Sequence, residues 1–263
     1  MVQFYCRIKV NFVFEPGETP LATFDQSEYQ VRFEWGERGV GELAPKSDFV
    51  IIVDVLSFST CVDVATTQGA TVFPFGWKDQ SAAVYAKSRD ALLVNRRGQG
   101  TFSLSPPSLA NLPRDSRIVL PSPNGSTLTL VASDHSRVLC GCLRNCRSVA
   151  NFVNREGGSV TVVACGERWM PGDTLRPAME DQLGAGAIIQ KLKGTKSPEA
   201  GSAEATFRAC ENVLLETLSA CSSGKELTEK GYGEDVTCAG QIDSSQSQPL
   251  LSGEAYIDQS EVL

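Results

Sequence analysis

Histidine is scarce in this sequence, and that scarcity limits the catalytic and metal sites it can build. His135 is the only histidine among 263 residues and stands in the polar segment 134–136. The position predicts a surface turn, so we assign His135 no role and expect neither a Ser-His-Asp triad nor a Cys-His pair. Zinc is not favoured either, because the nine cysteines form no paired Cys-x-x-Cys motifs.

The sequence also lacks a long apolar run and a surplus of positive charge. No run approaches the roughly 20 residues that a membrane-spanning helix needs, so we expect no membrane partner. The net charge of -7 argues against general nucleic-acid binding, which requires a basic surface. An anionic small substrate is compatible with that charge, because clustered arginines can reverse the potential in a cleft. The first ten residues show no signal peptide, and the cysteine count is odd, so we expect reduced thiols and a cytoplasmic location.

The chain is organised around a short apolar run followed by an acid. Phe49–Val53 is rich in β-branched residues, which favours a strand buried on both faces of a parallel sheet. Asp54 follows directly, then the hydroxyl residues Ser59 and Thr60 and a predicted helix over 62–68. Ligands of open α/β sheets bind at the carboxyl ends of strands, so Asp54 is the first candidate functional residue. The alternative is that Asp54 only caps the following helix.

Strands alternate with helices from residue 71 to residue 193, and this alternation predicts the fold. We expect an α/β protein with three α/β/α layers and a mostly parallel, doubly wound sheet. Residues 1–45 are expected to form N-terminal strands packed on the sheet (2–14 and 29–35), with a loop over 36–45. One α/β domain is expected over 46–243. The Ser- and Gln-rich tail, 244–263, is expected to be loose in its first part.

A second polar stretch follows the predicted strand at 117–120. In Pro-Ser-Pro-Asn-Gly-Ser (121–126), Ser122, Asn124, Gly125 and Ser126 open a helix whose free amide groups could hold an anion. The alternative is a plain tight turn with a capping serine.

Two further stretches bring charged residues to expected strand or helix ends. Glu167 and Arg168 stand in a predicted turn after the strand at 159–165, where Arg168 could pair with a phosphate. Glu180 and Asp181 open a helix rich in glycine, although acids also occur there simply because of the helix dipole. These acids and Asp54 would together offer the hard oxygen ligands that Mg²⁺ prefers. Such a site, with arginines, would suit phosphoryl transfer.

Five short blocks follow one another along the chain: Asp-Val-Leu-Ser-Phe-Ser-Thr (54–60), Pro-Ser-Pro-Asn-Gly-Ser (121–126), Ala-Cys-Gly-Glu-Arg (164–168), Glu-Asp-Gln-Leu-Gly-Ala-Gly (180–186) and Glu-Asp-Val-Thr-Cys (234–238). In this order they resemble the 2-phosphosulfolactate phosphatase family, over about residues 48 to 242. The resemblance implies an α/β/α architecture and a Mg²⁺-dependent acid phosphatase. Its substrate would be 2-phospho-3-sulfolactate, cleaved to 3-sulfolactate and phosphate on the route to coenzyme M.

The resemblance and the strand-end reasoning together assign the candidate site. The catalytic candidates are Asp54 and Arg168. The candidate phosphate ligands are Ser59, Thr60, Ser122, Asn124, Gly125, Ser126 and Arg144, and the candidate Mg²⁺ ligands are Asp54, Glu167, Glu180 and Asp181. We expect the side chains of Asp54, Asn124, Arg168 and Asp181 to meet in one crevice along one rim of the sheet.

One residue departs from the family blocks. The first block of the family carries Arg where this chain has Ser57. A non-catalytic anion-binding homologue of the same fold is therefore the alternative function, and a structural subunit with an unrelated surface function is a third. The expected partner is a small anionic phosphate ester, and a homodimer is the assembly we consider.

Overall fold

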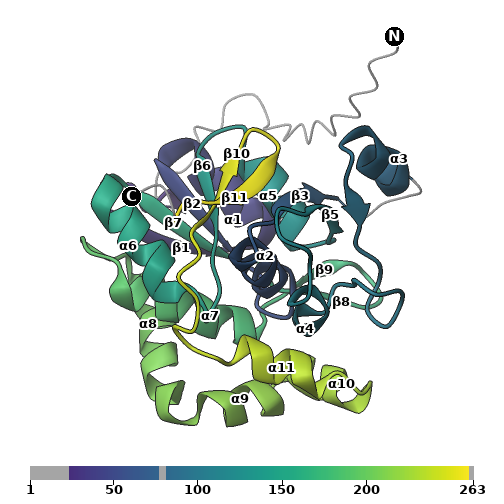
Figure 1. Ribbon diagram of the computed structural model, residues 1–263. Helices are drawn as coiled ribbons and strands as arrows, with labels where there is room; N and C mark the ends of the chain where they lie inside the picture. The colour runs from purple at the N-terminus through teal and green to yellow at the C-terminus, as the bar shows by residue number, and fades with distance from the viewer. Residues whose placement is uncertain (1–23, 77–80, 261–263) are drawn as a thin grey trace.

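The computed structural model describes residues 24–76 and 81–260, and its centre is one large mixed sheet (Figure 1). The expected strand at 2–14 lies outside the described residues. In pairing order the strands of this sheet are β1 (Val31–Trp35), β7 (Val160–Ala164), β2 (Phe49–Val53), β6 (Arg137–Cys140), β10 (Pro249–Ser252), β11 (Ala255–Asp258), β3 (Thr71–Phe75), β5 (Arg117–Pro121) and β4 (Leu92–Leu93). A separate small hairpin pairs β8 (Glu167–Trp169) with β9 (Thr174–Arg176).

The sheet consists of two parallel halves joined by an antiparallel hairpin. Strands β1, β7, β2 and β6 are mutually parallel, as are β3, β5 and β4. Between them, β10 pairs antiparallel with β6, β11 with β10, and β3 with β11. Three successive reversals mean that β3, β5 and β4 run in the opposite sense to β2 along the hydrogen-bond ladders. The mostly parallel sheet is confirmed, and the reversal inside it was not predicted.

Helices cover both faces of the sheet and make the three-layer α/β architecture that we expected. Buried residues of β2 alternate between the two sides, because successive strand side chains point to opposite faces. Ile51 and Val53 belong to one apolar core, and Val50 and Ile52 to the other. The first core is completed by α6 (Cys146–Glu156), α7 (Met179–Lys191) and α8 (Pro198–Cys210), the second by α1 (Gly36–Leu43), α2 (Phe58–Thr67) and α5 (Gly125–Ala132).

Shorter helices lie around these layers. They are α3 (Ser81–Ser88), α4 (Pro106–Leu109), α9 (Leu214–Ala220), α10 (Ser222–Glu229) and α11 (Gly233–Ala239), with 3₁₀ turns at Ala44–Lys46 and Glu211–Val213. In Figure 1, α9, α10 and α11 run together along the lower edge of the molecule, below α7 and α4. None of the helices in the described ranges combines the length and apolar character that a bilayer crossing requires.

Three local expectations were wrong. Residues 36–43 form helix α1 rather than a loop, and its buried Val40 and Leu43 pack against the sheet. The turn expected at Glu167 is the first strand of the β8–β9 hairpin. The first part of the tail, 244–248, forms no helix or strand but is not loose, because Ser245 and Ser247 are buried and hydrogen-bonded to α2. The residues after it form β10 and β11 in the middle of the sheet. There Tyr256 is fully buried, and its hydroxyl lies 2.8 Å from that of Thr129 in α5.

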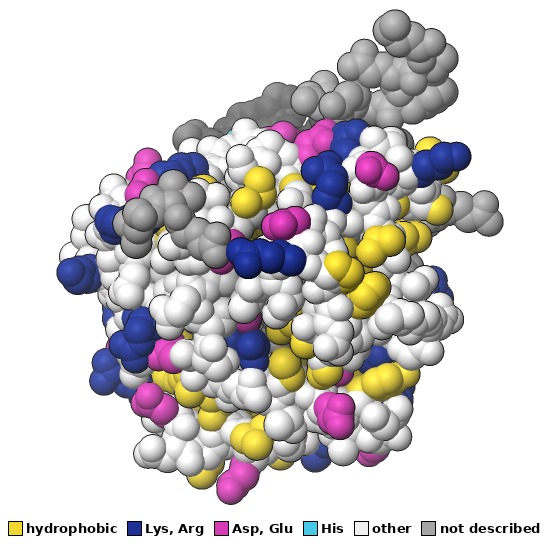
Figure 2. Space-filling view, in the orientation of Figure 1, with side chains coloured by type: hydrophobic (Ala, Val, Ile, Leu, Met, Phe, Trp, Pro, Cys, Tyr) yellow, Lys and Arg dark blue, Asp and Glu magenta, His cyan; other side chains and the backbone are white. Residues whose placement is uncertain are grey.

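Surface charge is mixed on the side of the molecule shown in Figure 2. Lysine and arginine side chains are interspersed there with aspartate and glutamate, and neither sign covers a broad area of this face.

Helix α7 contacts its neighbours through glycines, as its glycine-rich sequence suggested. A Cβ at Gly184 would lie 2.6 Å from a methyl carbon of Val55, beyond the end of β2. A Cβ at Gly186 would lie 2.2 Å from the carbonyl oxygen of Ala203 in α8. These close backbone approaches leave no room for a methyl group and hold α7 between the sheet and α8.

A matched pair of glycine substitutions tests this packing. Gly186→Ala should lower the free energy of unfolding by about 1–3 kcal/mol, because overpacking outweighs the better helix propensity of alanine. Gly201→Ala in α8 has open space around the new methyl group and should raise stability by about 0.5–1 kcal/mol. Urea denaturation of both variants gives the comparison, and equal effects of the two changes would contradict the packing described.

Candidate functional site

The Asp54 carboxylate lies between the first turns of two helices. It follows β2 directly and is 7% exposed. Its Oδ1 accepts a hydrogen bond from the Phe58 amide of α2 (3.2 Å), and its Oδ2 accepts one from the Gly125 amide of α5 (3.0 Å). The Ser122 hydroxyl lies 3.4 Å from the same Oδ2. Because the beginning of a helix carries free amide donors and the positive end of the dipole, both helices favour the charged form of Asp54.

Glycine is required at position 125 because the carboxylate approaches the backbone so closely. A Cβ on Gly125 would lie 2.1 Å from Cδ1 of Phe58 and 2.9 Å from Oδ2 of Asp54. Within the stretch predicted to bind an anion at 121–126, the Gly125 amide and the Ser122 hydroxyl contact an anion in this structure, and that anion is the chain's own Asp54.

Asp181 brings the start of α7 to the same strand ends. Its Oδ1 accepts from the Val55 amide (2.7 Å), just after β2, and its Oδ2 accepts from the Gly166 amide (2.8 Å), just after β7. The side chain is 3% exposed, and the neighbouring Glu180 is 2% exposed. The acids after β2 and at the start of α7 thus meet, as the sequence predicted.

Burial and neighbouring negative charge raise the pKa values of Asp54, Glu167 and Asp181. Burial raises the pKa of Asp54 to about 6, against the lowering effect of its amide donors, and the charge of Glu180 raises it further. Burial, with the charges of Asp54 and Glu180, raises the pKa of Glu167 to about 7. The pKa of Asp181 is raised well above its ordinary value by burial and then by Glu180 and Asp54. The site is therefore a desolvated cluster of like charges that favours a positive guest.

Glu167 and Arg168 diverge because they are neighbours on a strand. Glu167 is half-buried and accepts from the Asn124 side-chain amide at 3.4 Å, so Asn124 also reaches the site. Arg168 is exposed, and its guanidinium contacts Asp173 at the hairpin turn. Arg176 pairs with Glu167 across the β8–β9 hairpin, and its charge lowers the pKa of Glu167. The hairpin therefore places the cation of Arg176 beside Glu167. Arg168, which we predicted to be catalytic, lies against Asp173 and not beside the clustered carboxylates.

Several predicted phosphate ligands have other partners. The Ser59 hydroxyl donates to the Asp54 carbonyl (2.7 Å), that of Thr60 to the Val55 carbonyl (2.7 Å) and that of Ser126 to the Leu120 carbonyl (2.9 Å). All three hydroxyl residues are fully buried, so they secure the local backbone and do not face a ligand.

Arg144 also lies elsewhere than we expected. Its Nε donates to buried Asp63 at 2.8 Å, and its Nη1 donates to the Gln241 side chain at 2.5 Å. The guanidinium thus connects the middle of α2 to the segment after α11 and makes no described contact with Asp54.

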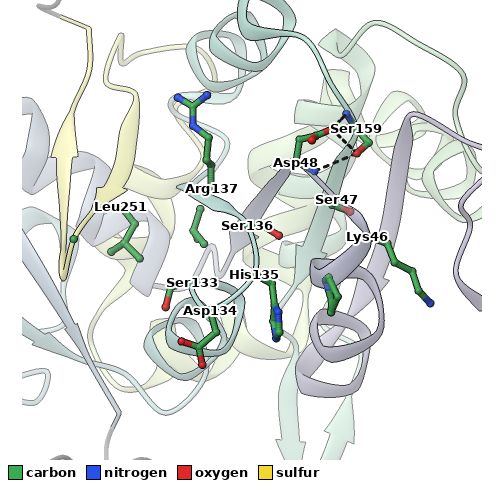
Figure 3. A pocket seen from close by; sticks show the side chains of 13 residues that line it. Lys46, Ser47, Asp48, Ser133, Asp134, His135, Ser136, Arg137, Ser159 and Leu251 are labelled. Atoms are coloured by element: carbon green, nitrogen blue, oxygen red, sulfur yellow. Dashed lines mark hydrogen bonds between the residues drawn. The ribbon is translucent and has the colours of Figure 1, made fainter.

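A broad open depression lies at the other end of the parallel strands. It has a volume of about 840 Å³ and is lined by residues at or just before the beginnings of β2 and β6, including Asp48 and Arg137. Figure 3 shows His135 and Asp134 on its rim and the hydrogen bonds between Asp48 and Ser159. None of the predicted site residues lines it, because those residues follow the carboxyl ends of their strands and this depression lies at the amino ends of β2 and β6.

A second hollow adjoins the acidic cluster. It has a volume of about 620 Å³, and Arg176, Met179 and Cys221 are among its lining residues. The Cys221 thiol donates to Oε2 of Glu180 at 3.4 Å, so the wall of this hollow contacts one of the clustered acids. A small ligand in the hollow would lie next to Arg176.

The donor types fit a hard divalent cation, whereas their present arrangement does not yet enclose one. Ionised carboxylates offer about four lone-pair sites each, so Asp54 and Asp181 keep acceptor capacity beyond their present hydrogen bonds. Within 24–76 and 81–260, however, no three His, Cys, Asp or Glu side chains are grouped closely enough to hold a metal ion.

Two arginines near the site were missed from the sequence. Arg176 reaches it through the unpredicted β8–β9 hairpin. Arg97 comes from the long polar loop after β4 and donates to the Ser57 hydroxyl at the start of α2. No local pattern marks either residue, since both are placed by contacts between distant segments.

Comparison with known proteins agrees with this geometry. A family model described as 2-phosphosulpholactate phosphatase matches residues 40–254. A protein of Gloeobacter violaceus named probable 2-phosphosulfolactate phosphatase is 30% identical over 222 residues, covering 79% of this chain and 91% of that protein. One of Methanothermobacter thermautotrophicus, named 2-phosphosulfolactate phosphatase, is 29% identical over 198 residues, covering 72% of this chain and 80% of that protein.

The matched region contains all the carboxylates gathered around Asp54, both helix starts that hold it, and the hairpin that brings Arg176. Because the family model matches most of the chain and the named relatives cover most of it too, the chain belongs to the 2-phosphosulfolactate phosphatase family of phosphoric monoester hydrolases.

Proposed function

We propose that this protein is a Mg²⁺-dependent phosphatase that hydrolyses 2-phosphosulfolactate to 3-sulfolactate and phosphate. The observation that carries the proposal is the group of four interacting carboxylates at the ends of β2 and β7, with Asp54 held between two helix starts. The names of the family and of the relatives support the reaction and the substrate.

The excess of negative charge is itself an argument for a metal ion. A phosphate dianion would be repelled by the carboxylates of Asp54, Glu167, Glu180 and Asp181 unless a cation lay between them. These four residues would hold the ion. When bound, Mg²⁺ would neutralise charge on the phosphoryl oxygens and make the phosphorus more susceptible to attack.

Residues of this chain supply the remaining roles. Asp54 is either a metal ligand or the nucleophile, and trapping a phosphorylated Asp54 in a rapid quench distinguishes the two. Asn124 orients Glu167 through its amide. Arg176, beside Glu167 and lining the adjoining hollow, offers a guanidinium to an oxyanion of the substrate.

The non-catalytic alternative rested on Ser57 in place of the family arginine. The clustered acids favour catalysis over simple anion binding, because four carboxylates would weaken the binding of an anion in the absence of a metal. Anion binding without turnover, with or without Mg²⁺, would instead support the alternative.

Asp54→Asn should reduce kcat for 2-phosphosulfolactate by about 10³-fold, because a neutral amide provides neither the nucleophile nor the anionic ligand. Release of inorganic phosphate is the measurement. The exposed Asp134→Asn, on the rim of the opposite depression, is the matched control and should keep wild-type activity.

Folding must be checked in the same experiment. An asparagine amide would turn its N–H groups toward the Phe58 or Gly125 amide, where no acceptor stands. Circular dichroism therefore accompanies the assay. Glu167→Gln, at a half-buried residue with one described hydrogen bond, is the second variant and should lower kcat by about tenfold or more. Full activity in both folded variants would contradict the proposed site.

Mg²⁺ should raise the melting temperature of the metal-free protein, because a bound cation relieves repulsion among buried carboxylates and binds only the folded state. Differential scanning fluorimetry with and without Mg²⁺ measures the shift. Glu180→Gln should reduce the shift while retaining an acceptor for the Cys221 thiol. A melting temperature unaffected by Mg²⁺, together with full activity in a chelator, would contradict a metal site.

A further inference from the structure

Arg97 lies at the beginning of α2, although 40 residues of sequence separate it from Ser57. Its Nη2 donates to the Ser57 hydroxyl at 2.5 Å. Its Nε donates to Oδ2 of Asp235 in α11 at 2.7 Å. The loop after β4 thus crosses to two helices and places one guanidinium where they approach each other.

The guanidinium is held in a fixed orientation. Asp235 is 2% exposed, and its second oxygen accepts from the Ser105 hydroxyl at 2.5 Å. The ring of Tyr232 lies 5.5 Å from the Arg97 guanidinium carbon, within the range of a cation–π contact. In Figure 1, α4 lies below α2 and α11 lies below α4, so the Arg97 side chain reaches from the start of α2 to α11 beside α4. A pre-oriented guanidinium loses less conformational freedom when it binds a ligand.

The same guanidinium keeps donors for a ligand. Among the described residues, none accepts a hydrogen bond from Nη1 of Arg97, and the side chain is 20% exposed. Asp235 and Ser57 therefore take Nε–H and one N–H of Nη2, and three of the five guanidinium N–H donors have no described acceptor and can bind an anion.

Arg97 and Asp54 contact neighbouring residues at the start of α2. Ser57, which contacts Arg97, is followed directly by Phe58, whose amide donates to Asp54. The buried Cys61 thiol, one turn further along α2, interacts electrostatically with both Asp54 and Arg97. A small substrate whose reacting end lies at Asp54 could thus also contact the Arg97 guanidinium.

We propose that Arg97 binds the second anionic group of the substrate, a sulfonate or a carboxylate on the carbon skeleton, while the phosphate ester lies at Asp54. The inference rests on the proposed function and names a specificity residue for it. The Ser57 hydroxyl, at the position where the family block has Arg, contacts the guanidinium that performs this role in the present chain.

The test compares Arg97→Gln with wild type on four esters. They are 2-phosphosulfolactate, 2-phospholactate without the sulfonate, O-phosphoisethionate without the carboxylate, and p-nitrophenyl phosphate without either group. KM for 2-phosphosulfolactate should rise about tenfold or more, because a charge-assisted pair is lost, with kcat changed less than about threefold. The values for p-nitrophenyl phosphate should stay within about twofold of wild type.

The two partial substrates identify the group that is bound. A rise in KM for O-phosphoisethionate alone assigns Arg97 to the sulfonate, and a rise for 2-phospholactate alone assigns it to the carboxylate. Either result supports the proposal. An equal loss on p-nitrophenyl phosphate would show that Arg97 is only a structural clamp, and no change on any ester would show that it does not contact substrate. Both of these outcomes overturn the proposal.

Two controls protect the experiment. Arg208→Gln removes an exposed arginine that also pairs with an acid, Glu204 at 2.6 Å, and should leave every kinetic constant unchanged. If Arg97→Gln does not fold, Arg97→Lys keeps a charge near Asp235 without the fork of donors. It should raise KM several-fold only for the esters that carry a second anionic group besides the phosphate.

Failure of the proposed function is distinguishable from failure of this inference. If wild type cleaves none of the four esters, the phosphatase proposal fails, and the Arg97 proposal is then tested by calorimetric titration with 3-sulfolactate. Binding that weakens about tenfold or more in Arg97→Gln supports it, and equal or absent binding by the two proteins overturns it.

Discussion

The interaction on which the site depends is the capture of the Asp54 carboxylate by the amides of Phe58 and Gly125, at the beginnings of α2 and α5. The first bond joins the end of β2 to the helix that follows it, and the second joins it to α5, which follows β5 in the other half of the sheet. A buried carboxylate is costly unless it is hydrogen-bonded, and helix starts offer donors that the helix itself cannot satisfy. The Asp54 carboxylate therefore satisfies free amides of α2 and α5, and the same hydrogen bonds offset the cost of its own desolvation.

The C-terminal hairpin determines how the halves of the sheet meet. Strands β10 and β11 stand between β6 and β3, and their antiparallel pairings reverse the direction of the second half. Because β5 runs in the opposite direction to β2, the carboxyl ends of these two strands do not lie side by side on one edge of the sheet. They meet because residues 122–124 lead from β5 to α5, whose first amide reaches Asp54. Buried Tyr256 secures the same helix through Thr129.

The site gathers like charges around this anchor, and its nearby cations come from outside the sheet. Asp54, Glu167 and Asp181 have raised pKa values because burial removes water from carboxylates that also repel one another. Arg176 arrives on the β8–β9 hairpin, and Arg97 arrives on the loop after β4, clamped by Asp235 of α11. The strands and first helical turns position the acids, whereas loops position the arginines. This division suits a scaffold that keeps one reaction centre and varies the groups that recognise a substrate.

The sequence by itself determined the elements with strong local signals. The apolar run at Phe49–Val53 and the acid after it predicted a buried strand and a strand-end carboxylate, because burial on both faces and an isolated acid are visible without neighbours. Glu180 and Asp181 were found in the same way, at the start of a helix whose glycines marked close packing. The order of five short blocks was sufficient to indicate the family.

Only the tertiary structure decided which charged groups meet. Arg168 and Arg176 are equally plausible in the sequence, and pairing in the β8–β9 hairpin places Arg176 beside Glu167 while strand alternation turns Arg168 away. The tail gave no strong strand signal, because β10 and β11 are four residues each and acquire their apolar neighbours from strands more than 100 residues earlier. Periodicity reports the surroundings of a residue along its own element, whereas the partners of Arg97 and Tyr256 are set by packing between segments far apart in the chain.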